Sequence, residues 1–176
     1  MQSSTIFTVF LIFLISTTVV YADHVTSDYD RHISFEKFKT FMWVQEPQTD
    51  EPFMKERLMA AVNTQLTNRG LIVVNEGADC VVDAALTIDE RRTWQTYYDS
   101  FGWDWGWDYS GWATTTEITF DVATITVDLF DSHTNKLAWR GTATDEVSHH
   151  PEKRSKNIRK EIEKMFRGFP PVRVNY

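Results

Sequence analysis

The sequence of 176 residues contains a single cysteine, Cys80, which lies inside an apolar run. An internal disulfide is therefore excluded, and the folded chain must be stabilised by a packed core. Lipid attachment to a cysteine near the N-terminus is excluded as well, because Cys80 lies far along the chain. The apolar surroundings of Cys80 favour a buried, inert thiol over a catalytic one.

The sequence also lacks the local motifs that mark common active sites. It has no Gly-x-Ser-x-Gly elbow for a nucleophilic serine, no His-Glu-x-x-His zinc motif, no phosphate-binding loop and no dinucleotide fingerprint. His149 and His150 are adjacent, whereas a helical metal site places its histidines one turn apart. We therefore expect no metal site and no cofactor.

Positive charge is scarce, because 18 Lys and Arg face 25 Asp and Glu, for a net charge of −7. A nucleic-acid-binding protein needs a broad positive face, so this acidic balance argues against nucleic acid as a partner. Residues 149–167 are the exception, with seven Lys or Arg against three Glu. A solvated helix face is the simpler interpretation of that segment, and contact with phosphate or anionic lipid is the alternative.

A long apolar run occurs near the N-terminus, over residues 6–20, and it is interrupted by polar residues. The run is typical of a secretory signal peptide, since Val20 and Ala22 match the pattern that signal peptidase accepts for a cut after Ala22. The alternative, an uncleaved anchor, needs about 20 apolar residues. We expect a signal peptide at 1–22 and a single α+β domain at 23–176, periplasmic or secreted, with no transmembrane segment after cleavage.

Two segments carry apolar residues at helical spacing. The first follows Pro52, which suits a first helical turn, and ends before Gly70. The second follows Pro151. Each has one apolar stripe and is expected to pack by that face. The stripes consist of Met54, Leu58, Val62 and Leu66, and of Ile158, Ile162, Met165, Phe166 and Phe169.

Between these helices the apolar residues alternate, which predicts strands. Residues 80–89 form a half-buried strand, and 115–130 form a longer one whose alternation slips at Val122 and Ala123, which predicts a bulge or bend there. A polar turn at 131–136 leads into a return strand, so an antiparallel hairpin is expected. The predicted fold is α+β, an antiparallel β-sheet with the two main helices packed on one face.

The most unusual segment is 94–112, which holds five of the seven tryptophans and lies between two predicted strands. In an extended chain its alternate indoles project from one face, where they can stack on sugar rings, enter a membrane interface or contact a protein. The alternative is that they fold back and close the core. The candidate binding residues are Trp103, Trp105, Trp107, Tyr109 and Trp112.

Three blocks of the sequence resemble a known family. They are Asp28–Asp30 with Phe35–Trp43, the hairpin block Ala123–Gly141, and the closing Met165–Pro171. Together they are similar to bacterial cell-envelope proteins of the family called domain of unknown function 4136, many of which are lipoproteins. The resemblance implies an envelope setting, and the family has no established activity or site to carry over. This chain departs from the lipoprotein form because it lacks the lipid-bearing cysteine.

These observations predict an exported envelope protein without catalysis, which acts as a binding or structural accessory through its Trp-rich loop. Its expected partner is an envelope glycan, a membrane interface or a protein. The alternative is an envelope glycan hydrolase that uses Asp104 and Asp108 beside the tryptophans. A Trp substitution should abolish association in a binding module, whereas a single Asp→Asn change should abolish turnover in a hydrolase.

Overall fold

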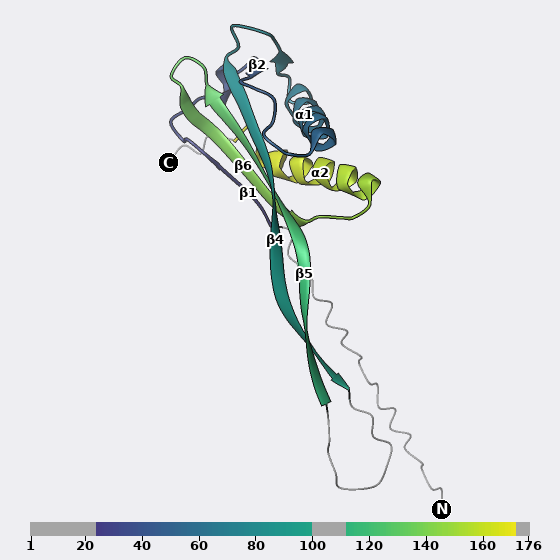
Figure 1. The fold of residues 1–176 in the computed structure, drawn as a ribbon. Helices are drawn as coiled ribbons and strands as arrows, with labels where there is room; N and C mark the ends of the chain where they lie inside the picture. The colour runs from purple at the N-terminus through teal and green to yellow at the C-terminus, as the bar shows by residue number, and fades with distance from the viewer. Residues whose placement is uncertain (1–23, 100–111, 172–176) are drawn as a thin grey trace, which may run out of the picture.

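The computed structural model describes residues 24–99 and 112–171. The fold is α+β, with six strands in one sheet and two main helices (Figure 1). The predicted signal peptide lies outside the described residues. The elements in chain order are β1 (His24–Tyr29), the short 3-10 helix η1 (Phe35–Lys37), β2 (Thr40–Trp43), α1 (Pro52–Thr67), β3 (Ile72–Val73), β4 (Cys80–Asp99), β5 (Trp112–Asp131), β6 (Lys136–Glu146), α2 (Pro151–Met165) and the short 3-10 helix η2 (Phe166–Gly168).

The sheet is mixed, so the prediction of a purely antiparallel sheet was wrong. The strand order is β1-β6-β5-β4-β2-β3, and β2 runs parallel to both β3 and β4, while the other pairs are antiparallel. The physical reason is α1, which follows β2 and carries the chain back before β3 begins. A crossover of this length lets the next strands pair parallel to β2.

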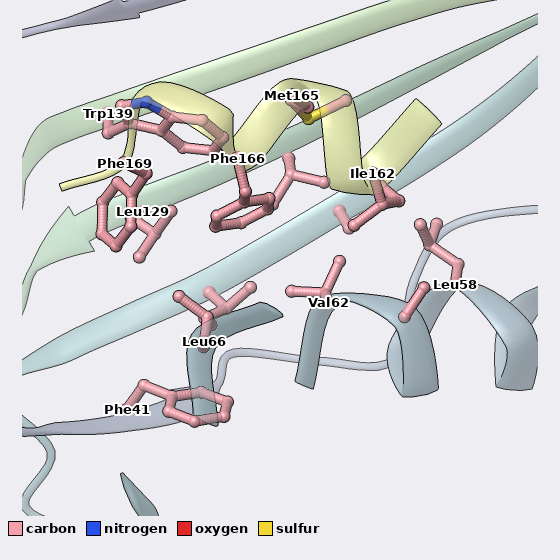
Figure 2. Packing of buried hydrophobic residues seen from close by; sticks show 14 of the residues in the cluster. Phe41, Leu58, Val62, Leu66, Leu129, Trp139, Ile162, Met165, Phe166 and Phe169 are labelled. Atoms are coloured by element: carbon pink, nitrogen blue, oxygen red, sulfur yellow. The ribbon is translucent and has the colours of Figure 1, made fainter. Parts of the chain in front are cut away.

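The core lies between the helices and one face of the sheet. Both helices lie on the same side of the sheet in Figure 1, and the stripe residues of α1 and α2 share one buried cluster with alternate residues of β4, β5 and β6. Figure 2 shows Leu129 of β5 beside Phe169, with Leu66 on the α1 side of the same core. The Trp139 ring lies 4.6 Å from that of Phe166 and 5.4 Å from that of Phe169, measured between centroids. Such aromatic contacts stabilise a core beyond their apolar area.

The predicted bulge at Val122 and Ala123 is absent from the β4–β5 pair, whose register runs without interruption through both residues. The observed irregularity lies further along, between Leu129 and Phe130 in the pairing of β5 with β6. The slip in alternation has another cause. The apolar residues of β5 change from one face of a regular strand to the other at this point, because the strand leaves the body of the protein here.

Candidate functional site

Two strands extend well beyond the rest of the sheet and form the feature that we call the arm, residues 89–99 of β4 and 112–121 of β5. β4 and β5 pair over twenty residues each, from Cys80 opposite Asp131 to Asp99 opposite Trp112. β6 pairs with β5 only as far as Val122, which lies opposite Glu146. At about 3.4 Å per residue the arm is about 35 Å long. In Figure 1 the arm extends away from the helices and beyond the ends of the other strands.

One face of the arm continues the core face of the sheet but, apart from Trp94, is mostly polar. Arg92 lies between two carboxylates, with its guanidinium 3.2 Å from Glu90 Oε1 and 3.7 Å from Glu117 Oε1. The hydroxyls of Thr96 and Thr115 are 3.0 Å apart across the strands. These pairs are exposed, so each stabilises the arm only slightly. The arm is therefore held by main-chain pairing more than by side-chain burial.

Aromatic side chains on the arm are unusually open to solvent. Trp94 is 69% exposed and Tyr97 is 55% exposed, and they lie on opposite faces of β4. The reverse face also carries the apolar row of Ile118, Phe120 and Val122 from β5, which is half-buried to buried.

The predicted binding residues Trp103, Trp105, Trp107 and Tyr109 lie outside the described residues, and so do Asp104 and Asp108 of the alternative. Trp112 is the first residue of β5, paired with Asp99. The strands thus place residues 99 and 112 opposite each other at the far end of the arm. Sequence reasoning did not include Trp94 and Tyr97 among the candidates. Both lie at the start of the Trp-rich segment, on β4, and their aromatic character was the only signal in the sequence.

The root of the arm has a groove with mixed charges. Its lining includes Glu51, Asp89 and Asp121 together with His149 and Arg154. Within residues 24–99 and 112–171, no group of three or more His, Cys, Asp or Glu side chains is placed to hold a metal ion. The groove therefore has polar character without a defined chemical centre.

A second polar feature lies beside this groove, on α2. Glu161 is only 1% exposed, and burial raises the pKa of its carboxyl group. Its Oε1 accepts a hydrogen bond from Lys164 Nζ at 3.1 Å, while its Oε2 and the Nε of Arg154 have no partner among the described atoms. The adjoining cavity holds about 30 Å³. This volume suits a single water molecule and not an organic ligand.

Cys80 is the one thiol of the chain, and its position makes it a poor nucleophile. It is completely buried on β4, and burial together with the negative charges of Asp79 and Asp131 raises the pKa of its thiol to about 12. The thiol therefore stays protonated at neutral pH, whereas a catalytic cysteine needs a lowered pKa and access to substrate. The expected burial of this thiol is confirmed.

A family model described as a domain of unknown function, DUF4136, matches residues 25–171. The chain belongs to this family. The match spans nearly all described elements of the DUF4136 domain, from β1 to the residues after η2, and it includes both strands of the arm. It confirms the resemblance that the three sequence blocks indicated. No curated protein matches the chain significantly.

Solved structures with a similar fold are distant in sequence. A PDZ domain protein from Parabacteroides distasonis aligns with a TM-score of 0.56 and 14% identity, covering 86% of this chain and 36% of that one. The DUF4136 chain thus spans about a third of the length of that protein. The PelC dodecamer from Paraburkholderia phytofirmans aligns with a TM-score of 0.51 and 15% identity, covering 82% and 96%. These likenesses show the fold alone. No helix among the described residues is long and apolar enough to cross a membrane.

Proposed function

We propose that this DUF4136 protein is an exported cell-envelope protein without catalysis of its own, and that it works as a binding or structural accessory through its arm. The Trp-rich segment carries the contact residues Trp103, Trp105, Trp107, Tyr109 and Trp112. The partner is an envelope glycan, a membrane interface or another envelope protein. Export rests on the predicted signal peptide at residues 1–22, and the envelope setting rests on the family resemblance.

The observation that carries this proposal is the length of the arm beyond the core. None of its residues belongs to the buried cluster of the body. Ordering roughly twenty residues costs on the order of 1–2 kcal/mol each in backbone entropy, and here little apolar burial offsets that cost. The exposed side chains of Trp94 and Tyr97 add apolar surface that faces water. A contact made at the far end of the arm gives a physical reason for keeping both features.

The test is co-sedimentation of the mature protein with cell-wall and outer-membrane fractions. We expect the Trp103/Trp105/Trp107→Ala triple variant to lose binding at an unchanged melting temperature, because these residues contact the partner and not the core. Phe53→Ala is the matched control, since Phe53 is an aromatic residue that is 73% exposed on α1 and is not part of the arm. It should bind like the parent protein.

Two results would contradict the proposal. Parental binding by the triple variant would show that the tryptophans make no contact. A large fall in its melting temperature would place them in the core, because loss of a buried Trp lowers the free energy of unfolding by about 3–5 kcal/mol.

A further inference from the structure

The basic segment at residues 149–167 forms the outer surface of α2. The apolar stripe of this helix is buried against the core, while Lys153, Lys156 and Arg159 are exposed. Among the described residues, none of these three cations has an ion-pair partner. The segment carries seven Lys or Arg against three Glu in a chain whose net charge is −7. The surface of α2 is therefore the place where this acidic protein attracts an anion.

A groove lies between α1 and α2 and includes part of this basic surface. It holds about 480 Å³, which is within the range of small-molecule sites. α1 contributes Arg57, Ala60, Ala61, Thr64 and Gln65, and α2 contributes Ser155, Arg159 and Glu163. The two alanines keep the groove open, because their side chains are too short to fill the space between the longer residues.

The two helices run in the same direction, so the two ends of the groove differ. Just after α1, the Nε of Arg69 donates a hydrogen bond to the carbonyl of Phe169, which follows α2, at 2.8 Å. Near the other end, Met54 of α1 and Asn157 of α2 line one small cavity. One end of the groove therefore lies toward the starts of both helices, and the other lies toward their ends.

Toward the helix starts the groove is cationic. Arg57 has no acidic residue three or four positions away on α1, and among the described residues its guanidinium contacts only the Met54 sulfur, at 3.8 Å. Arg159 forms no ion pair with Glu163, which follows it by one turn, and an Arg that precedes its Glu is the weaker order for such a pair. Two guanidinium groups from separate helices thus line the groove without a carboxylate partner. Their planar forks match the oxygens of a phosphate group.

Toward the helix ends the groove offers hydrogen-bonding groups of another kind. The Oε1 of Gln65 accepts a hydrogen bond from Arg69 Nη1 at 2.8 Å, which leaves the amide N–H groups of Gln65 to donate. Glu163 is exposed, and its carboxylate can accept hydrogen bonds. An amide donor beside a carboxylate acceptor suits hydroxyl groups, whereas the negative charge repels a second phosphate.

We propose that this groove binds a small phosphate monoester that also carries hydroxyl groups, of the class of glycerol phosphates and sugar phosphates. The phosphate lies between Arg57 and Arg159, and the hydroxyl groups contact Gln65 and Glu163. A lipid headgroup offers the same phosphate chemistry. A lipid surface fits this groove less well, because its lining has no apolar side chain larger than alanine to enter a bilayer. The site contains no residue of the arm and does not depend on the proposed function.

The experiment is isothermal titration calorimetry of the mature protein with glycerol 3-phosphate. We expect one site per chain, and no binding of glycerol alone. Arg57→Gln with Arg159→Gln should weaken binding by about tenfold or more, because charge-assisted hydrogen bonds to phosphate are lost. The matched control is Lys153→Gln with Lys156→Gln, which removes the same charge from exposed positions outside the groove. It should bind nearly as tightly as the parent.

Ala60→Leu tests the shape of the site without changing its charge. Ala60 is exposed on α1, and leucine forms helices almost as well as alanine, so the variant should melt like the parent. Its longer side chain fills the groove, and we expect it to lose binding of glycerol 3-phosphate.

Three results would overturn the inference. The first is a parent protein that does not bind glycerol 3-phosphate. The second is equal weakening by the lysine pair and the arginine pair, which would show a diffuse effect of charge. The third is binding to vesicles of phosphatidylglycerol and not to glycerol 3-phosphate, which would make the basic surface a contact for lipid.

Discussion

Single residues determine how closely neighbouring elements of the body pack and how they are connected. Gly141 on β6 shows this for packing, because an added Cβ there would lie 2.2 Å from Met165 Cγ and 2.5 Å from Trp139 Cη2. A glycine at this position therefore lets Met165 and the edge of the Trp139 ring approach the backbone of β6 closely. Asp79 joins the loop before β4 to the start of β2. Its carboxylate accepts hydrogen bonds from the amides of Lys39 and Thr40 and from the Thr40 hydroxyl, all at 2.9 Å.

The pKa of Asp79 gives a pH-dependent test of this junction. The backbone amide of Lys39 lowers this pKa most, followed by the hydroxyl and amide of Thr40. Because the folded-state pKa lies below the unfolded one, the carboxylate stabilises the fold at neutral pH, and this stabilisation is lost as the pH falls below about 4. We expect Asp79→Asn to melt at a lower temperature than the parent at neutral pH, with the difference shrinking in acid.

The control for Asp79→Asn is Glu76→Gln, which removes one negative charge from an exposed position in the same loop. Its melting temperature should follow that of the parent at both pH values. A difference between Asp79→Asn and the parent that stays constant from neutral pH to acid would show that the carboxylate charge plays no part.

The elements of this protein are stabilised in two different ways. α1 and α2 hold their places by apolar stripes that enter the shared core. The arm is regular for a different reason, since its strands satisfy each other's main-chain groups over an unbroken register. The stability of the body should therefore not depend on the arm, and the body should fold without it.

Replacing residues 92–119 by Asn-Gly tests this separation. Arg91 and Phe120 form a directly opposed pair, and the alternation of the backbone makes it a hydrogen-bonded one, which a two-residue type I′ turn can join. We expect the shortened protein to keep the helix content and melting temperature of the parent, by circular dichroism, and to lose envelope binding. A shortened protein that fails to fold would show that the arm is part of the cooperative unit.

At the scale of the whole molecule, one buried cluster connects almost every element of the body. It takes residues from η1, β2, α1, β4, β5, β6, α2 and η2. The arm and the basic surface of α2 lie outside it. Because a single cluster of this kind cannot be divided without exposing apolar surface, its loss should be cooperative.

Calorimetry of the arm-shortened protein tests this cooperativity on the body alone. We expect one transition whose calorimetric enthalpy equals the van't Hoff enthalpy. Two resolved transitions would show that the helices and the sheet unfold independently, and the expectation of a single domain over residues 23–176 would then be wrong.

The sequence by itself determined the local structure and the family. The stripes of α1 and α2, the turn at Asp131–Lys136 and the hairpin of β5 and β6 depend on short-range spacing, and Pro52 stands at the start of α1 as expected. The three motif blocks were sufficient for the family. These features are readable because burial of one face imposes a period on neighbouring residues.

Only the tertiary structure decided the parallel pairing of β2 with β4 and the length of the arm. β2 and β4 are joined through α1, so their direction depends on how that helix packs and not on either strand's own residues. The β4 strand of the arm was not predicted from hydropathy, because its residues beyond Asp89 are stabilised by main-chain bonds to a strand more than ten residues away, and such bonds impose no apolar period. The apolar pattern reports burial, and the arm of this protein is built with little of it.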